Sequence, residues 1–257
     1  MRIAMSSSDF ESFWQTLQSS KDTAVFTGAG ASTLSGIRDF RGKDGVYSKP
    51  WQGYAVEDIL SLPFFRKDPA IFYAWAREFC YCLDRFKPCI VHTMLAKLEE
   101  KGMIGGVMTQ NIDVLHQAGG SKNVLEVHGS PSNHHCLKCR KTFGYDEIAP
   151  TVMDGKVPHC DCGGVIKPDI IFYGENLDEK TLTACFNWAE RCDLMIVLGS
   201  SLTVQPAASI PLAAYQSHAK VCIVNAQPTP LDFIADYHFD DLKTFSEAVM
   251  KKLDEMA

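Results

Sequence analysis

Four cysteines in the middle of the chain have the spacing of a metal site. They form two pairs, Cys136-Leu-Lys-Cys139 and Cys160-Asp-Cys162. The gap of the first pair lets two sulfurs point at one ion from a tight turn, and four thiolates suit tetrahedral zinc. The second pair is one residue tighter, so His159, His134 or His135 remains an alternative ligand, although we expect all four cysteines to bind. The set leaves no position for water, which predicts a structural zinc ion.

The surroundings of these cysteines also favour a metal. The stretch 133–164 is short of large apolar residues and could not build a core by burial alone. The other six of the ten cysteines, at positions 80, 82, 89, 185, 192 and 222, are scattered, and we expect them to be buried as small hydrophobic side chains. Paired thiols in a chain of this size without a signal segment fit metal binding in a reducing compartment better than a disulfide framework. We therefore expect a cytoplasmic protein.

A glycine-rich turn near the start of the chain could bind a phosphate. Gly28-Ala29-Gly30 follows a β-prone run and precedes Ala31-Ser32-Thr33, so backbone amides could approach a pyrophosphate closely. As a dehydrogenase fingerprint the turn fails, because Thr33 stands where the third glycine belongs and no strand-ending acid lies about 20 residues on. Hydride transfer is the lesser hypothesis, and a strand-to-helix turn without a ligand stays open for the tripeptide alone.

The elements that must position these residues alternate between strand and helix. Runs of β-prone and apolar residues predict strands at 23–27, up to 109, near 124–127, at 193–198 and at 220–225. Apolar residues at helical spacing predict helices at 9–20, 69–86, 92–101, 206–217 and from 242 onward. The last two strands are apolar throughout, which is typical of a parallel sheet covered on both faces. We expect an α/β protein with a Rossmann-like parallel sheet and helices on both faces.

Two segments do not fit that alternation and predict a small inserted lobe. Residues 44–88 are rich in aromatic residues and proline, so we interpret them as a helical insertion. Residues 132–164 carry the cysteine pairs and would form a zinc-binding module. The Rossmann-like domain is then assembled from 1–43, 89–131 and 165–257, with the lobe interwoven by insertion.

The composition disfavours several function classes. With 46% hydrophobic residues, the 257-residue chain can bury a sizeable core, so disorder is not expected. Its 25 Lys and Arg against 31 Asp and Glu give a formal charge of −6 without a long basic run, which disfavours nucleic acid as a ligand. No window approaches the roughly 18 apolar residues of a membrane span, so we expect no membrane partner.

Several short strings, in order along the chain, together resemble one family. The glycine-rich turn continues as Gly28-Ala-Gly-Ala-Ser-Thr-Leu-Ser-Gly36-Ile-Arg-Asp-Phe-Arg41-Gly42. It is followed by Thr109-Gln-Asn-Ile-Asp113, His128-Gly129, the cysteine pairs, Ile170-Ile-Phe-Tyr-Gly-Glu175, Gly199-Ser-Ser-Leu202 and Val224-Asn225. The set closely resembles the sirtuin family of NAD-dependent protein deacylases over nearly the whole chain. The chain departs from the family at Arg38, where proline is usual, and in its tighter second cysteine pair.

The resemblance implies a reaction that consumes NAD. The carbonyl oxygen of an acylated lysine attacks the ribose carbon that carries nicotinamide, which releases nicotinamide and leads to deacylated lysine and O-acyl-ADP-ribose. Acyl-lysine segments of proteins are then the substrates, and the zinc ion is structural. The resemblance assigns proton transfer to His128, whose neutral imidazole could take a proton from a ribose hydroxyl. It makes Asn111 a second catalytic residue.

The same resemblance assigns the contacts with NAD. Asn111 and Asp113 would hold the nicotinamide carboxamide, while Ile112 closes the pocket. Gln110 would bond the ribose, and Phe40 would shield the reacting face. The implied contacts with the phosphates and the adjoining sugar are Ala29, Thr33 and Arg41, and those near the adenosine half are Gly199, Ser200, Ser201, Asn225 and Asp241.

One further string predicts how the substrate binds. Ile170 to Glu175 resembles the strand with which the substrate peptide pairs, and Ile171 would line the acyl-lysine tunnel. Desuccinylating members of the family carry Tyr and Arg three residues apart, whereas Tyr73 and Arg77 are four apart here, so we expect a preference for uncharged acyl groups. A protein ADP-ribosyltransferase that uses the same NAD pocket is the alternative function, and a non-catalytic NAD sensor is the third hypothesis.

Overall fold

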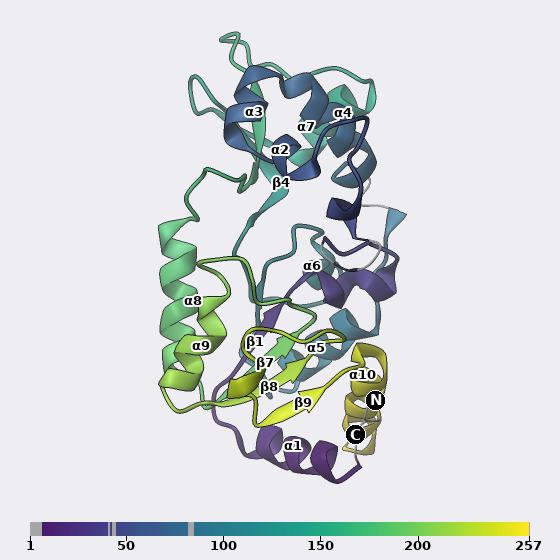
Figure 1. Cartoon of the computed structure of the whole chain (residues 1–257), viewed down its shortest axis with the longest axis vertical. Coiled ribbons are helices and arrows are strands. Elements are labelled where there is room, and N and C mark those ends of the chain that lie inside the picture. The colour runs from purple at the N-terminus through teal and green to yellow at the C-terminus, as the bar shows by residue number, and fades with distance from the viewer. Residues whose placement is uncertain (1–6, 41, 43–44, 82–84, 257) are drawn as a thin grey trace.

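The structure is a computed structural model that describes residues 7–40, 42, 45–81 and 85–256. Arg41, an expected phosphate contact, and Cys82, an expected core residue, lie outside the described residues. Figure 1 shows a larger lobe, where both ends of the chain lie, and a smaller lobe stacked on it along the long axis. The chain passes between the lobes more than once, so the smaller lobe is an insertion in the sequence of the larger one.

The larger lobe is built on a six-stranded sheet in which every neighbouring pair is parallel. In spatial order the strands are β3 (Val124–Glu126), β2 (Val107–Thr109), β1 (Thr23–Thr27), β7 (Leu194–Leu198), β8 (Lys220–Val224) and β9 (Tyr237–Phe239). The order runs outward from β1 to β3 and then changes direction at β7, as in a Rossmann-like, doubly wound fold. The predicted parallel sheet is confirmed, and β9 is an edge strand that the sequence analysis missed.

Helices cover both faces of this sheet. One face carries α1 (Ser7–Ser19), α5 (Ile90–Glu100) and α10 (Leu242–Glu255), and the other carries α8 (Glu179–Arg191) and α9 (Ser209–Gln216). Val25 and Ile196 point into the first core, and their neighbours Phe26 and Val197 point into the second. Successive residues of a strand face opposite sides, and burial on both sides explains why these strands are apolar throughout. A single helical turn, α6 (Leu115–Ala118), follows β2.

The smaller lobe combines short helices with an antiparallel sheet of three strands. Its helices are α2 (Val56–Ile59), α3 (Leu62–Lys67), α4 (Pro69–Phe79) and α7 (Tyr145–Met153), and its strands in spatial order are β5 (Thr142–Gly144), β4 (Gly129–Cys136) and β6 (Ile166–Ile170). Pro69 lies in the first turn of α4 as predicted, and the carboxylate of Asp68 caps the helix by accepting a hydrogen bond from the amide of Ala70. The helix ends at Phe79, earlier than the predicted end at residue 86.

One apolar core joins the two inserted stretches of chain. Phe65 and Phe72 from the first stretch pack with Ile148 and Phe172 from later in the sequence, and the ring centroids of Phe65 and Phe172 are 5.5 Å apart. The sheet of this lobe includes β4, which begins before residue 132, and β6, which lies after residue 164. The division of the chain at those two boundaries therefore stays a proposal.

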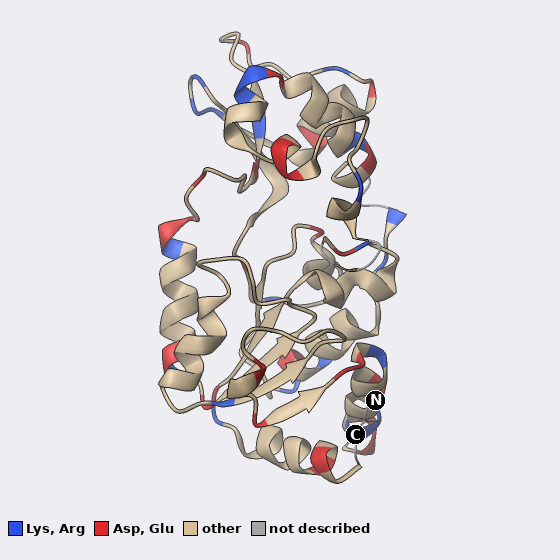
Figure 2. Cartoon of the chain, in the orientation of Figure 1, with Lys and Arg blue, Asp and Glu red and all other residues tan. Residues whose placement is uncertain are grey.

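Charged residues are spread over both lobes. Figure 2 shows Lys and Arg interspersed with Asp and Glu on both lobes. Within the part of the chain that the structure describes, no helix is long and apolar enough to cross a membrane. A functional site must therefore be sought in particular side chains and not in a face of one charge.

Candidate active site and zinc centre

The expected NAD-binding residues gather at one edge of the six-stranded sheet. Because the strands are parallel, their carboxyl ends meet at the same edge, and β1, β2, β7 and β8 are each followed there by a string that carries expected NAD-binding residues. In doubly wound sheets, ligands bind outside the carboxyl ends where the strand order changes direction. In this sheet that point lies between β1 and β7.

The glycine-rich turn after β1 packs directly against the turn after β7. The amide of Gly28 donates to the carbonyl of Leu198 (3.0 Å), and the amide of Gly30 donates to the carbonyl of Gly199 (2.8 Å). A Cβ atom on Gly30 would lie 2.7 Å from the Cα of Gly199, so no side chain fits there. Gly199 has a φ of +63°, which glycine adopts without strain. Packing therefore requires these glycines, and a short 3-10 helix (Ala29–Ser35) begins directly after Gly28.

Two of the three expected phosphate contacts lie on this 3-10 helix. Ala29 is half-buried, whereas Thr33 is exposed. The hydroxyl of Thr33 donates to the carbonyl of Gly30 at 2.8 Å. The third contact, Arg41, lies outside the described residues. The position of the two described residues beside the turn agrees with a role near the phosphates, which stays a prediction.

Asn111 and Asp113 are linked through a serine that the sequence analysis did not assign. Asn111 is 7% exposed, and its Nδ2 atom donates to the carbonyl of Gly28 (3.0 Å) and to the hydroxyl of Ser32 (3.1 Å). The Ser32 hydroxyl in turn donates to the Asp113 carboxylate (2.6 Å). The turn after β1 and the turn after β2 are thus joined by side chains. Ser32 stands within the glycine-rich string, which is the signal that could have found it.

Buried polar side chains hold the turn after β2 from below. The hydroxyl of Thr109 accepts from the amide of Asn111 (3.0 Å) and from the hydroxyl of Thr27 (2.8 Å). The Thr27 hydroxyl also lies 2.9 Å from Nε2 of His116. Burial, assisted by the nearby His92, lowers the pKa of His116 to about 3. His116 is therefore neutral near pH 7 and supports the turn after β2 through its contact with Thr27.

His128 lies between the turn after β2 and the first strand of the smaller lobe, β4. Its Nδ1 atom is 3.0 Å from the carbonyl oxygen of Gln110. Because a carbonyl oxygen can only accept, Nδ1 carries the proton, and the neutral ring then has its lone pair on Nε2. The carbonyl of His128 accepts from the amide of Ile171 (2.9 Å). The next residue, Gly129, has a φ of +71°, and a Cβ atom on it would lie 1.9 Å from the Asp169 carbonyl.

Gln110 connects the turn after β2 with the turn after β7. Its side-chain oxygen accepts from the hydroxyl of Ser200 at 2.8 Å. Ser200 is buried and also accepts from the amide of Leu202 (3.2 Å), which fixes the hydroxyl. The Gln110–Ser200 bond joins the turns after β2 and β7, and β1 lies between these two strands in the sheet. Gln110 therefore lies near the point where the strand order reverses.

The other expected adenosine contacts lie in the turns after β7, β8 and β9. Ser201 pairs with the hydroxyl of Thr203 (3.0 Å), and Asn225 donates to the carbonyl of Gln227 (2.7 Å). The carboxylate of Asp241 accepts from a backbone amide of α10 and caps that helix. Each of these side chains is held within its own turn, at or near the end of a strand.

Phe40 and Ile112 lie against the core of the smaller lobe, and both are half-buried. The ring of Phe40 packs on Tyr47 with centroids 5.1 Å apart. Ile171 is also half-buried, directly after β6. The expected strand through Glu175 is wrong in extent, because β6 ends at Ile170 and the following residues form a turn whose backbone pairs with the start of α3.

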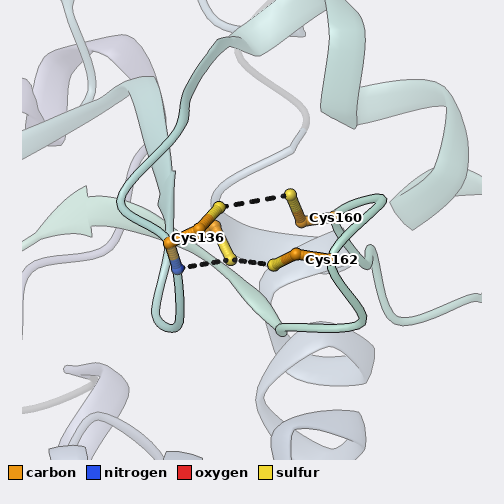
Figure 3. A group of neighbouring side chains, drawn as sticks. Cys136, Cys160 and Cys162 are labelled. Carbon is orange, nitrogen blue, oxygen red and sulfur yellow. Dashed lines mark hydrogen bonds between the residues drawn. The ribbon is translucent and has the colours of Figure 1, made fainter.

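The four paired cysteines form a compact cluster. Their sulfur atoms all lie within 4.8 Å of one another, and Figure 3 shows those of the labelled Cys136, Cys160 and Cys162. The Sγ atoms of Cys136 and Cys162 are 3.5 Å apart, and those of Cys139 and Cys160 are 3.6 Å apart. Four thiolates about 2.3 Å from one tetrahedral zinc ion stand about 3.8 Å apart, so the cluster fits the ion. With sulfur in every position the site is structural.

Glycine accommodates the tighter second pair. The amide of Cys160 donates to the carbonyl of Gly164 (2.8 Å), and the amide of Gly163 donates back to the carbonyl of Cys160 (2.8 Å). A Cβ atom on Gly164 would lie 2.5 Å from the sulfur of Cys136. The turn can therefore bring both sulfurs of the second pair up to the first pair despite the shorter gap.

The three histidines that remained as alternative ligands do not belong to this cluster. His159 is exposed, and its Nδ1 atom faces a backbone carbonyl at 2.9 Å. The Nε2 atom of His134 is hydrogen-bonded to the hydroxyl of Tyr81 (2.6 Å), and His135 pairs with the carboxylate of Asp169 (2.5 Å). The geometry favours the four cysteines that we expected.

The remaining cysteines lie mainly in the cores. Cys80, Cys185, Cys192 and Cys222 are buried as predicted, and burial raises the pKa of Cys185 to about 12. Cys89 differs, because it is half-buried and its sulfur lies 3.2 Å from Nδ1 of His92. Burial acts to raise the pKa of the Cys89 thiol, but the interactions with His92, together with hydrogen bonds from Ser35 and the amide of Val91, lower the pKa to about 7.

Comparison with known proteins identifies the family. The model of the Sir2 family matches residues 28–206. The chain therefore belongs to the Sir2 family, the sirtuins.

Among its relatives, the NAD-dependent protein deacetylase of Thermotoga maritima is 43% identical over 242 residues, which cover 93% of this chain and 96% of the relative. A solved structure of Sir2 with a p53 peptide and NAD+ has a TM-score of 0.87 and 40% identity, and the match covers 96% of this chain and 99% of that chain. A Sir2 variant with a deacetylated p53 peptide and 3'-O-acetyl ADP ribose gives a TM-score of 0.87 and 40% identity, with 96% and 98% covered. These matches span both lobes.

Proposed function

We propose that this sirtuin is an NAD-dependent protein lysine deacylase, which moves the acyl group of acyl-lysine segments in proteins to the ADP-ribose of NAD. The observation that carries the proposal is the position of His128. Its ring is bonded to the carbonyl of Gln110, and its own carbonyl is bonded to the amide of Ile171. One residue therefore joins the expected cofactor site to the expected substrate segment.

The hydrogen bond of His128 favours the tautomer that a general base needs. With the proton on Nδ1 and the lone pair on Nε2, the ring can accept a proton from a ribose hydroxyl. The bond to the carbonyl of Gln110 also fixes the orientation of the ring, so the imidazole does not have to rotate into position during the reaction. When bound, NAD supplies a ribose carbon that accepts the acyl oxygen as nicotinamide leaves.

The group of Asn111, Asp113 and Ser32 fits a carboxamide. A carboxamide offers two donors, and the Asp113 carboxylate and the side-chain oxygen of Asn111 can accept from them, since both hydrogens of the Asn111 Nδ2 atom are already donated to Gly28 and Ser32. Ser32 holds both side chains at fixed distances, so their orientation is set before the ligand arrives. Ile112 would close the apolar side of this pocket, and Phe40 would shield the reacting face.

The remaining contacts extend along the same edge of the sheet. We propose Gln110 for the ribose, because the Ser200 hydroxyl fixes its side chain. Backbone amides of the glycine-rich turn can approach a phosphate where a side chain would obstruct. The proposed phosphate contacts are Ala29, Thr33 and Arg41, and the proposed adenosine contacts are Gly199, Ser200, Ser201, Asn225 and Asp241.

An uncharged acyl group is the proposed substrate, with Ile171 lining its tunnel. An acidic acyl group would need a cation or a hydroxyl in that tunnel. Tyr73 is 3% exposed, and its hydroxyl donates to the carbonyl of Ile166 (2.5 Å) inside the smaller lobe. The Tyr73 hydroxyl is therefore already bonded inside the core and does not offer a donor to an acidic acyl group. This supports a preference for acetyl or other neutral acyl groups over succinyl.

We also propose a cytoplasmic location. All nine cysteines of the described residues have free thiols, and the zinc centre needs four thiolates. Disulfides form in oxidising compartments, so these thiols fit a reducing compartment.

The deciding experiment is mass spectrometry of an acetyl-lysine peptide incubated with the protein, with and without NAD. We expect NAD-dependent loss of the acetyl group together with free nicotinamide and O-acetyl-ADP-ribose. A His128→Ala variant should lose about 10²–10⁴-fold in rate, the usual contribution of a general base. ADP-ribosylated protein without acyl transfer would instead support the alternative transferase, and no turnover of any acyl peptide would contradict the proposal.

A further inference from the structure

A lysine is buried beside the segment that we expect to bind the substrate peptide. Lys167 lies on β6 and is only 1% exposed. Burying an ammonium group is costly unless opposite charge and hydrogen-bond acceptors surround it. The strand ends three residues later at Ile170, and residues 171–175 follow as an irregular turn.

The acceptors of this ammonium group all come from its own segment. The Nζ atom donates to the carbonyls of Pro168 (3.1 Å) and Ile170 (2.7 Å) and forms an ion pair with the carboxylate of Glu175 (2.9 Å). It also lies 3.9 Å from the centroid of the Phe172 ring, whose face stabilises a cation. With three donors and three acceptors the group is satisfied.

Glu175 holds the turn from its other end. Its carboxylate accepts from the amide of Phe172 (2.8 Å), and its own amide donates to the carbonyl of Phe172 (3.0 Å). Phe172 is 2% exposed and packs against both Phe65 and Phe72. The ion pair therefore connects the end of β6 with a turn that is anchored in the core of the smaller lobe.

Backbone hydrogen bonds also join the same turn to two other parts of the chain. The amide of Ile171 donates to the carbonyl of His128 (2.9 Å). Two residues later, the amide of Tyr173 donates to the carbonyl of Leu60 (2.8 Å). Three contacts thus fix the backbone of residues 170–175: the bond to His128, the bond to Leu60, and the bonds of the buried Lys167 to Ile170 and Glu175.

We propose that Lys167 and Glu175 are positioning residues for the peptide substrate: their buried ion pair fixes the backbone of residues 170–175 in the shape that binds an acyl-lysine segment. The inference rests on the proposed function. Neither side chain belongs to the turns that we assign to NAD. Loss of the pair should therefore weaken binding of the peptide and leave binding of NAD unchanged, whereas a merely structural role would affect both.

Three variants test this proposal. Lys167→Met keeps the length of the side chain and removes its charge, and Glu175→Gln removes the other charge while keeping a hydrogen-bond acceptor for Phe172. Lys251→Met is the control, because Lys251 is an exposed lysine of α10, away from the zinc centre, that also pairs with a carboxylate, Glu255, at 3.9 Å. The dissociation constant of a fluorescent acetyl-lysine peptide is measured by anisotropy without NAD, and KM for peptide and for NAD are measured from deacetylation.

For Lys167→Met we expect the dissociation constant and the KM of the peptide to rise at least about tenfold, which corresponds to about 1.4 kcal/mol. The KM for NAD should stay within about twofold. Glu175→Gln should shift the peptide values in the same direction, and Lys251→Met should shift neither. Zinc content and the melting temperature report whether each variant is folded.

Several results would overturn the inference. Unchanged peptide binding in a folded Lys167→Met protein, or equal rises in the KM of peptide and NAD, contradict it. If Lys167→Met does not fold, Glu175→Gln decides, and an unchanged peptide dissociation constant rejects the pair as a positioning device. A wild-type protein that does not deacetylate would overturn the proposed function and this inference together, whereas normal wild-type turnover beside unaffected variants overturns only the inference.

Discussion

The two lobes of this sirtuin are stabilised by different interactions. In the larger lobe, Phe13, Leu95 and Val197 are all 0% exposed, and apolar burial on both faces of the sheet accounts for its core. The core of the smaller lobe also contains aromatic rings, but it is continuous with three thiols of the zinc cluster (Cys136, Cys160 and Cys162) and with the buried ammonium group of Lys167. The stability of the larger lobe rests on close packing of apolar side chains. The smaller lobe is stabilised in addition by the zinc centre and by the buried ion pair of Lys167.

This difference has a functional consequence. Metal ligands must be deprotonated, and a structural zinc ion contributes directly to folding. Apolar burial has no such requirement. A chelator or an acid solution should therefore disturb the smaller lobe first, and with it the turn at 170–175 that we propose to bind the peptide. The strands that hold the expected NAD contacts should survive such treatment.

Loss of a zinc ligand should have the largest effect. Cys136→Ser replaces a buried thiolate of the cluster, so we expect zinc to be lost and deacylation to fall on the order of 100-fold or more. Far-ultraviolet circular dichroism should still show the helices of the larger lobe. Zinc is measured by atomic emission, with Cys185→Ser as a buried cysteine control that keeps the metal. Full zinc content and full activity in Cys136→Ser would refute the comparison of the two lobes.

A cavity in the larger lobe should have a large effect of a different kind. Leu95 lies on α5 within the first core, and Leu95→Ala should lower the free energy of unfolding by about 2–5 kcal/mol. Urea titration measures this change. The variant should retain its zinc while it is folded, because the metal belongs to the other lobe. A loss of less than about 1 kcal/mol would show that this core tolerates the missing volume.

The larger lobe should nevertheless respond to acid through one buried histidine. Burial, together with the nearby His92, lowers the pKa of His116 to about 3, below its unfolded value of 6.5. Between these values the unfolded chain binds more protons than the folded protein, so stability falls as the pH drops from about 6.5 toward 3. His116→Gln keeps a polar side chain near Thr27 and should reduce this loss in urea titrations at pH 7 and pH 5. An equal loss in wild type and variant would assign the acid sensitivity to other groups.

Surface charge on the larger lobe should matter least. Lys243 and Glu247 form an exposed pair four residues apart on α10, with 3.8 Å between charged atoms. Such pairs contribute about 0.2–0.5 kcal/mol, so Lys243→Ala should leave the midpoint of unfolding nearly unchanged. Differential scanning calorimetry checks this expectation. A clear drop in the melting temperature would mean that charge stabilises the larger lobe as well.

The sequence by itself determined the parts of this protein that depend on neighbouring residues. Continuous apolar runs predicted the buried parallel strands, and the cysteine pairs predicted the zinc centre. The strings after the strands predicted where His128 and the Gln110-to-Asp113 turn would lie relative to the sheet. These features could be found because a strand, a metal-binding turn and a strand-end loop each depend on residue types a few positions apart.

Only the tertiary structure decided the features that depend on distant residues. The short strand β9 and the helix α7, which contains Pro150, have weak local signals and form because larger elements pack beside them. Ser32 gains its place from bonds to residues about 80 positions away. A lysine in sequence is ordinarily a surface residue, and Lys167 is buried because the fold surrounds it with carbonyls, an aromatic ring and Glu175. These contacts between distant residues form only when the chain has folded, so no local sequence pattern predicts them.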